Sequence, residues 1–259
     1  MGKGSHEIHG LEIYDILKTL GSGSFGQVFQ VMDKHKNIVY AIKKCSLNGN
    51  LTEKHKQNVL RETENLIKLR SEYVIKYYYS WIQYNCLYIQ MDCLAGNLKQ
   101  LLDNKKQLFG KIMTEFEYYL SYNIFKQLVE SVEYLHKKHI IHRDLKPDNV
   151  LIANYNEMYI SNKHNYRYIK LCDFGLSKSV DVLSDRYKQS SVKHTKDVGN
   201  VEYMAPEGQT TEYNHLLDIY SLALIGAQIF GFNTRDIENG NGQQMDRQIG
   251  DNDLKVETF

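Results

Sequence analysis

The sequence predicts an α+β protein with a small β-rich N-terminal part, which carries one helix, and a larger, mostly helical C-terminal part. Two observations support this fold class. Period-two and apolar runs occur in residues 11–44 and 73–91, as in β-strands. Apolar residues at helical spacing occur in residues 116–136, and a second apolar helix is expected from near Leu216. A chain of 259 residues is expected to form one or two compact units.

In the N-terminal part, "YDILKTL" leads into a glycine-rich turn, and "QVFQVM" and "IVYAIKK" follow as further strands. Residues from about Thr52 to Arg70 predict a helix, in which apolar Leu60, Ile67 and Leu69 stand among many charges. The runs "YVIKYYYSW" and "CLYIQM" predict two more strands. We therefore expect an N-terminal lobe at 11–91 and a junction at 92–96.

In the C-terminal part, 97–259, a long helix is expected within residues 116–136. Five apolar residues at spacings of four, four, four and three form one face of this helix: Leu120, Ile124, Leu128, Val132 and Leu135. The runs "NVLI" and "YIKLC" predict short strands, and the helix near Leu216 follows. After Phe232 the sequence is polar with weak periodicity, so this lobe is expected to be short, incomplete after about residue 232 and partly disordered.

Composition and charge exclude several classes of protein. The net charge of +1 gives no bulk attraction to nucleic acid or a membrane, so neither is expected as a partner. The four cysteines lie far apart without a C-x-x-C pair, which argues against zinc and disulfides and favours a reducing, cytoplasmic location. The N-terminus lacks the apolar segment of a signal peptide. The run "LLDIYSLALIGAQIFGF" is too short for a membrane span and contains Asp218.

A glycine motif lies in "GSGSFGQV", where Gly21, Gly23 and Gly26 form a G-x-G-x-x-G pattern. In a dinucleotide-binding fold such glycines open a helix, and an acidic residue follows about 20 positions later. Here strand-like "QVFQV" follows, and no Asp or Glu occurs between Asp33 and Glu53. This context favours a β-hairpin whose glycines allow backbone to approach phosphates, with Val28 under the base.

Lys43 ends the apolar run "YAI" on the next strand, seventeen residues after Gly26. A lysine at this place is often a solvated strand edge, but it is also where a strand lysine can reach nucleotide phosphates. Such a lysine needs a carboxylate to hold it. The following helix offers Glu62 and Glu64, and a surface pairing with a basic neighbour remains open for Glu64.

The octapeptide "HRDLKPDN" is the strongest local signal. Asp144 would accept or orient a substrate hydroxyl proton, Lys146 would neutralise a moving phosphoryl group, and Asn149 would hold magnesium. In "CDFGLS", Asp173 supplies a hard carboxylate oxygen suited to Mg²⁺. Phe174 is expected to pack inward beside it. A D-F-G tripeptide alone could be a simple turn, but here it follows the octapeptide.

Two further motifs have scaffold roles: "YMAPE" closes the segment that begins at Asp173, and Asp218 in "DIYSL" opens the apolar helix. In this order, the motifs resemble those of eukaryotic-type protein kinases over residues 14–231. The resemblance implies a bilobal protein kinase fold that uses ATP and Mg²⁺, with adenine between Ala41 and the linker 91–94 and with Met91 as gatekeeper. The family spacing selects Glu62 as the partner of Lys43.

The resemblance implies catalytic roles for Lys43, Glu62, Asp144 and Lys146, and metal binding by Asn149 and Asp173. It also implies a set of ATP-binding residues: Leu20, Gly21, Ser22, Gly23, Ser24, Phe25, Gly26, Val28, Ala41, Lys43, Met91, Asp92, Cys93 and Leu94.

A narrower resemblance concerns the substrate. The lysine at position 146 within "HRDLKPDN" resembles the lysine found in this motif of serine/threonine kinases. The runs "VIKYYYSWIQYNCLYIQMD", "HTKDVGNVEYMAPE" and "YNHLLDIYSL" resemble kinases of the alpha subunit of translation initiation factor 2. This implies phosphorylation of that factor, which damps translation under stress, and a homodimer formed through the N-lobe. It also implies activation by phosphorylation at Thr195, with Arg143 receiving the phosphate.

The sequence departs from this family at three places. Asn200 stands where the family usually has threonine, the insertion "ANYNEMYISNKHNYRY" lengthens the segment before Asp173, and only forty-one residues follow Asp218. Two alternatives therefore stay open beside a kinase of translation initiation factor 2. One is a serine/threonine kinase with another substrate. The other is a truncated or pseudokinase-like ATP-binding interaction module with little activity.

Overall fold

The computed structural model describes residues 10–23, 26–47, 53–109, 113–153, 167–179, 203–205, 215–232 and 234. The predictions for Ser24, Phe25, Thr195 and Asn200 fall outside these residues. The chain forms two compact units. The first comprises Met1–Leu94 with Asp173–Leu176, and the second comprises Ala95–Cys172 with Ser177–Phe259. The short D-F-G segment is thus grouped with the N-terminal unit, although it is distant in sequence.

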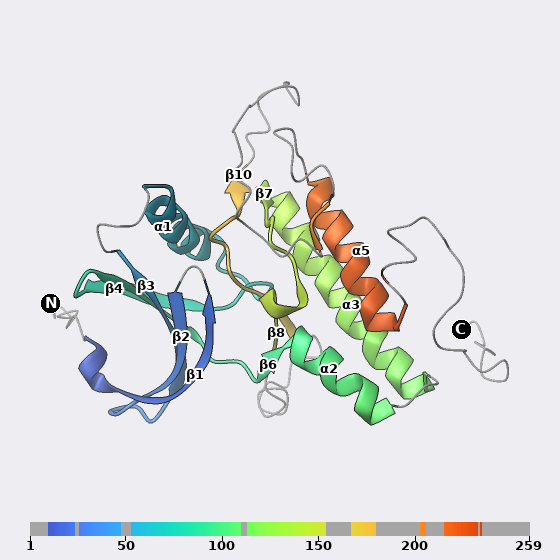
Figure 1. Cartoon of the computed structure of the whole chain (residues 1–259), viewed down its shortest axis with the longest axis horizontal. Helices are drawn as coiled ribbons and strands as arrows, with labels where there is room; N and C mark the ends of the chain where they lie inside the picture. The colour runs from blue at the N-terminus through green and yellow to red at the C-terminus, as the bar shows by residue number, and fades with distance from the viewer. Residues whose placement is uncertain are drawn as a thin grey trace, which may run out of the picture. The chain divides into compact units, whose positions relative to one another are not determined.

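The first unit is built on a five-stranded antiparallel sheet with strand order β1-β2-β3-β5-β4 (Figure 1). A short 3-10 helix, η1 (Leu11–Ile13), precedes the sheet, and helix α1 (Glu53–Lys68) follows the third strand. The strands are β1 (Tyr14–Gly23), β2 (Gly26–Asp33), β3 (Val39–Ser46), β4 (Tyr77–Gln83) and β5 (Cys86–Asp92). The predicted β-rich part with one helix is therefore confirmed.

One face of this sheet collects residues predicted to bind nucleotide. Val28 on β2 lies opposite Lys43 on β3, and Lys43 lies opposite Ile89 on β5. Ala41, two residues before Lys43, lies opposite Met91. Residues directly opposite in an antiparallel pair point to the same side, as do residues two apart on one strand. These five side chains therefore share one face.

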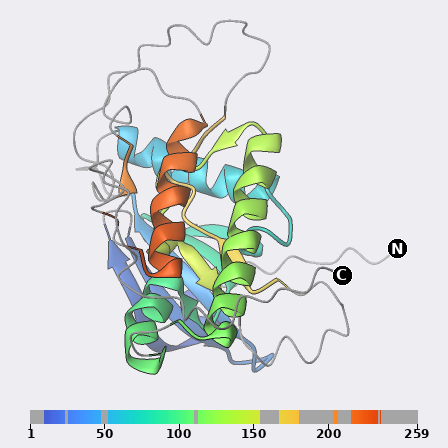
Figure 2. The same ribbon diagram turned by 90° about the vertical axis from the view of Figure 1, so that its right-hand side faces the viewer.

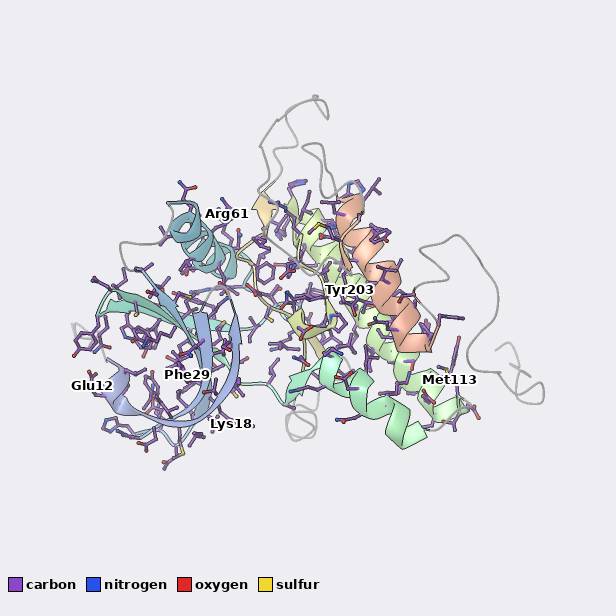
Figure 3. All side chains as sticks on the ribbon, in the orientation of Figure 1. Glu12, Lys18, Phe29, Arg61, Met113 and Tyr203 are labelled. Carbon is purple, nitrogen blue, oxygen red and sulfur yellow. The ribbon has the colours of Figure 1, made fainter. Side chains whose placement is uncertain are left out.

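The other face carries an aromatic core, which contains Tyr14, Val31, Tyr40, Ile42, Trp81, Cys86 and Tyr88. Trp81 stacks on Tyr88, with ring centroids 5.1 Å apart, and Phe29, labelled in Figure 3, packs against the cluster. The hydroxyl of Tyr14 lies 2.6 Å from that of Tyr79, and burial raises the pKa of Tyr14 above its ordinary value. Many of the tyrosines therefore serve as packing surface, with their polar tips hydrogen-bonded.

Helix α1 buries a stripe that differs from the one its most apolar residues suggest. Leu60 and Ile67 are exposed, with about half of each side chain accessible. Val59, Glu62 and Leu66 are buried instead, at helical spacings of three and four. A charged residue thus lies within the packed stripe of the helix, because it has a partner in the sheet.

The second unit consists mainly of helices α2 (Leu98–Phe109), α3 (Glu115–Lys137) and α5 (Leu216–Phe230). Helices α3 and α5 lie side by side (Figures 1 and 2). On α3, Ile124, Leu128, Val132 and Leu135 are buried, as the periodicity predicts, and Leu120 is half-buried. Gly226 on α5 allows this approach, because a Cβ atom there would lie 2.6 Å from the ring of Phe125.

Short strands complete the second unit. They are β6 (Gly96–Asn97), β7 (Ile140–Ile141), β8 (Val150–Ile152), β9 (Ile169–Leu171) and β10 (Lys178–Ser179). Strands β6, β8 and β9 form one small sheet, and β7 pairs with β10. A 3-10 helix, η2 (Pro147–Asn149), leads into β8. Within the described parts of the chain, no helix is long and apolar enough to cross a membrane.

Candidate active site

The glycine motif lies in the β1–β2 hairpin. Gly23 pairs with Gly26, and strand β2 begins at Gly26, so the hairpin prediction is confirmed over a helix-opening turn. Gly26 has φ +132°, and a Cβ atom there would lie 2.0 Å from the backbone oxygen of Lys44. At Gly21 a Cβ atom would meet nothing within 4 Å. Gly26 is thus required by its backbone conformation and packing, whereas Gly21 leaves open space over the backbone.

Lys43 is the centre of a buried charged cluster in the first unit. Its Nζ donates hydrogen bonds to both carboxylate oxygens of Glu62, each at 2.7 Å, and to Oδ1 of Asp173 at 3.2 Å. Lys43 is 6% exposed and Glu62 is 2% exposed, whereas Glu64 is exposed. The structure therefore brings together Lys43, Glu62 and Asp173 and leaves Glu64 out.

The charges of this cluster stabilise one another. Burial alone lowers the pKa of Lys43, but the carboxylates of Glu62 and Asp173 outweigh burial and raise that pKa above its ordinary value. Burial raises the pKa of Glu62, and Lys43 opposes this shift. Because both oxygens of Glu62 lie at 2.7 Å from the ammonium group, we assign the pair as ionised.

The backbone at Asp173 is held in an unusual conformation. Its φ is +63°, in the left-handed region that non-glycine residues seldom adopt. The next residue, Phe174, is fully buried, as expected from the sequence. A left-handed aspartate costs free energy and is often found where a side chain must be aimed for function. Here the carboxylate reaches Lys43.

The octapeptide forms a compact cluster around Asp144 in the second unit. Lys146 Nζ donates to Oδ2 of Asp144 at 2.8 Å, and Asn149 Nδ2 donates to the same oxygen at 3.0 Å. Asn149 Nδ2 also donates to the backbone oxygen of Asp144 at 2.7 Å. Pro147 begins the short helix η2, which folds the chain back so that Asn149 reaches Asp144. The three predicted residues are therefore brought together.

The side chain of Asp218 fixes the backbone of this loop by hydrogen bonds. The carboxylate, fully buried on α5, accepts hydrogen bonds from the backbone N–H of His142 at 2.8 Å and of Arg143 at 2.9 Å. The ring Nε2 of His136, near the end of α3, lies 2.9 Å from Oδ2 of Asp218. Arg143 has φ +70°, which these bonds stabilise. The loop that carries Asp144 is thus fixed by two helices.

Sequence reasoning missed these anchoring contacts, because it assigned Asp218 only to the scaffold. The available signal was a charged residue inside an otherwise apolar helix, since such a charge is buried only when it has partners. His142 was also missed: it is fully buried, and its Nε2 lies 3.0 Å from the backbone oxygen of Cys172, directly before Asp173. Tyr203, labelled in Figure 3, is also tied to α5, since its backbone oxygen accepts from Ser221 at 2.7 Å.

The remaining predicted nucleotide residues lie on the sheet and its following linker. Met91 is buried at the end of β5, and Asp92, Cys93 and Leu94 are half-buried. Burial raises the pKa of the Cys93 thiol, and a hydrogen bond with Gln30 opposes this shift. Leu20 on β1 is exposed. Ser22 on β1 pairs with Gln27 of β2.

Comparison with known proteins gives one family. The model of the protein kinase domain family matches residues 14–256. The chain is 32% identical over 216 residues to "Calcium-dependent protein kinase 4" of Plasmodium berghei (strain Anka), covering 83% of this chain and 36% of the relative. It is 31% identical over 217 residues to "Probable serine/threonine-protein kinase nek3" of Dictyostelium discoideum, covering 83% and 18% respectively.

A third relative is similar over a shorter stretch. The chain is 37% identical over 118 residues to "Eukaryotic translation initiation factor 2-alpha kinase pek-1" of Caenorhabditis elegans, covering 43% of this chain and 10% of the relative. The chain thus spans only about a third of the Plasmodium kinase and less of the others. The predicted serine/threonine protein kinase domain is confirmed, and the chain belongs to the protein kinase domain family.

Proposed function

We propose that this chain transfers the γ-phosphate of ATP to a serine or threonine hydroxyl of a protein. The observation that carries the proposal is the cluster on Asp144, where one carboxylate oxygen accepts from both Lys146 and Asn149. A carboxylate held in this way can accept or orient a substrate hydroxyl proton, with a cation beside it for phosphate charge. A purely structural loop would not need this arrangement.

In the proposed reaction, the substrate hydroxyl oxygen forms a bond to the γ-phosphorus while the bond to the β-phosphate oxygen breaks. The hydroxyl donates its hydrogen bond to Asp144, which takes or directs the proton. Lys146 stabilises the negative charge of the transferring group. Because Asp218 fixes the backbone of His142 and Arg143, the Asp144 carboxylate need not be reorganised during the reaction.

Lys43 would hold nucleotide phosphates, and Glu62 would keep its ammonium in place. The family implies a divalent metal, and the oxygen donors of Asp173 and Asn149 fit the preference of Mg²⁺ for a few carboxylate or amide oxygens together with substrate phosphates. Asn149 makes both hydrogen bonds to Asp144 through Nδ2, so its Oδ1 is not used in them. Magnesium supplies charge neutralisation of the phosphates when bound.

Asp144→Asn tests the proposal. The purified chain is incubated with Mg²⁺, radiolabelled ATP and a general protein substrate, and transfer is expected to fall about 100-fold or more in the variant. Asp148→Asn is the matched control, because Asp148 is an exposed carboxylate in the same loop. Equal transfer by Asp144→Asn and the wild type would contradict the proposal. ATP binding without transfer in the wild type would instead favour an interaction module.

We further propose the alpha subunit of translation initiation factor 2 as the substrate, so that the enzyme would damp translation under stress. The resemblance of the run at 74–92 and the similarity to the pek-1 kinase support this choice. Recombinant alpha subunit should be phosphorylated faster than a general substrate at equal concentration. A faster reaction with unrelated substrates would favour a serine/threonine kinase of another substrate.

Two regulatory features are proposed from the same resemblance. Phosphate on Thr195 would pair with Arg143, and mapping of phosphates after incubation with Mg-ATP tests this. Full activity in Thr195→Ala would contradict it. A homodimer would form through the N-terminal unit, where Ile82 and Tyr84 expose 65% and 82% of their surface. Sedimentation of the wild type and Ile82→Ser tests the dimer, which the substitution should weaken.

A further inference from the structure

A tyrosine outside the predicted site contacts Asp92, the second residue of the linker 91–94. Tyr78 on β4 donates a hydrogen bond from Oη to Oδ1 of Asp92 at 2.6 Å. Asp92 directly follows Met91 and belongs to the residues proposed to face the adenine. The backbone N–H of Asp92 donates to the backbone oxygen of Lys76 at 3.0 Å. Both the backbone and the side chain of Asp92 are therefore tied to the same stretch of β4.

A β-bulge directs Tyr78 to this position. On β4, Tyr77 pairs with Met91, and the next pair joins Tyr79 to Gln90, so Tyr78 is the extra residue. Without the bulge, side chains would alternate and Tyr78 and Tyr79 would point to opposite faces. With it, both lie on the face that carries the aromatic core. Bulges commonly re-aim a side chain beside a functional site.

The ring of Tyr78 is held on two sides. Tyr40 on β3 contacts it edge to face, with centroids 5.1 Å apart, and Tyr40 lies directly opposite Asp92 in the sheet. Lys76 Nζ lies 4.7 Å from the Tyr78 ring centroid. A phenol fixed in this way loses little further freedom when it holds the carboxylate, so the hydrogen bond retains most of its free energy.

We infer that Tyr78 is a positioning residue for nucleotide binding, which acts by fixing Asp92 and with it the linker against which the adenine packs. This inference rests on the proposed function, since it assumes that the linker binds ATP. Tyr78 lies on the face opposite Lys43, so its proposed effect on the nucleotide is transmitted through Asp92. Its loss should therefore weaken nucleotide binding equally in the ground and transition states, which changes KM but not kcat.

Tyr79→Phe provides a matched control on the same strand. Tyr79 also uses its hydroxyl in a hydrogen bond on the same face, to Tyr14 Oη at 2.6 Å, and in the sheet it lies opposite Gln90 rather than a linker residue. Tyr78→Phe and Tyr79→Phe each remove one oxygen atom. Any general weakening of the aromatic core should therefore lower the stability of both, whereas only Tyr78→Phe should change nucleotide binding.

The experiment measures the dissociation constant of Mg-ADP by calorimetry, KM and kcat for ATP, and urea unfolding without nucleotide. Tyr78→Phe should raise the dissociation constant and KM about fivefold with kcat within about twofold of the wild type. Tyr79→Phe should match the wild type in both constants. In an Asp92→Ala background, Tyr78→Phe should have no further effect, because its partner is gone.

Four results would decide against the inference. Unchanged ADP affinity in Tyr78→Phe, or an equal loss in Tyr79→Phe, would overturn it while leaving the proposed function in place. An additive loss in the double variant would show that Tyr78 does not act through Asp92. Absence of Mg-ADP binding by the wild-type chain would overturn the proposed function and the inference together.

Discussion

The carboxylate of Asp218, in the first turn of the apolar helix α5, accepts a hydrogen bond from the backbone N–H of Arg143 at 2.9 Å. Its other oxygen accepts from the N–H of His142 and contacts the ring of His136. Since Arg143 directly precedes Asp144, a residue 74 positions away in the chain fixes the backbone next to the proposed catalytic carboxylate.

Asp218→Ala should lower kcat for phosphate transfer about 100-fold or more, because the buried N–H of His142 and the part-buried N–H of Arg143 lose their acceptor at about 1–3 kcal/mol each. The dissociation constant of Mg-ADP should change much less, since Lys43 and the linker lie in the first unit. Glu133→Gln, an exposed change on α3, serves as control. A folded Asp218→Ala variant with normal kcat would rule out the anchoring role.

Lys43→Met should both abolish ATP-dependent transfer and lower the free energy of unfolding by about 3 kcal/mol, because it leaves the Glu62 carboxylate buried without its cation. Adding Glu62→Leu should restore much of that stability without restoring transfer. Urea unfolding and a transfer assay on the single and double variants separate the two effects. If the double variant were less stable than Lys43→Met, the explanation by an uncompensated charge would be wrong.

Gly26→Ala should destabilise the chain by at least about 2 kcal/mol, because its φ is +132° and the new Cβ atom would overlap the backbone oxygen of Lys44. Gly21→Ala should unfold at the wild-type urea concentration, since the space around its Cβ position is open. Its effect should instead appear in the KM for ATP. Similar unfolding midpoints for the two variants would contradict this difference.

The ionisation of Asp33 is expected to make the free energy of unfolding depend on pH in the acid range. Burial raises its pKa, but the backbone N–H groups of Lys36 and His35 outweigh burial and hold the pKa below its ordinary value. A lowered pKa in the folded state stabilises the fold at neutral pH, and this stability is lost as the pH falls below about 4 and through the lowered pKa. The neutral Asp33→Asn variant lacks this dependence.

The measurement is urea unfolding of the wild type and Asp33→Asn between pH 7 and pH 2.5. The wild type should be more stable by about 1 kcal/mol at pH 7, and the difference should shrink towards the acid end. Asp15→Asn is the control, because Asp15 forms only an exposed pair with Lys34. A difference that stayed constant over the whole range would exclude Asp33 as the titrating group.

The sequence predicted what short-range patterns determine. The period of two placed the strands, and the fixed spacing within "HRDLKPDN" placed Asp144, Lys146 and Asn149 around one point. Helix α2 was not predicted as a separate element, although Leu98, Leu101 and Leu102 recur at helical spacing in "LKQLLDNKKQLF". In helix α1 the buried face could not be predicted from the apolar residues alone. Exposed Leu60 and Ile67 look like core residues in the sequence, whereas buried Glu62 does not.

Two contacts between residues that are distant in the sequence were not predicted. The bulge at Tyr78 depends on a one-residue shift in strand pairing, which no local pattern encodes. The anchoring of the loop by Asp218 depends on the packing of α3 against α5, and the sequence alone shows only a charged residue within an apolar helix. Both contacts support residues of the site rather than belonging to it, which is why motif reasoning passed over them.

The distance between Asp218 and the loop it anchors has a consequence for synthesis on the ribosome. The N–H groups of His142 and Arg143 have no acceptor from this carboxylate until a further 76 and 75 residues have been translated. At roughly 5–20 residues per second, that interval lasts several seconds. A nascent chain that already holds the whole octapeptide therefore lacks these two hydrogen bonds, and the proposed phosphate transfer must await the synthesis of helix α5.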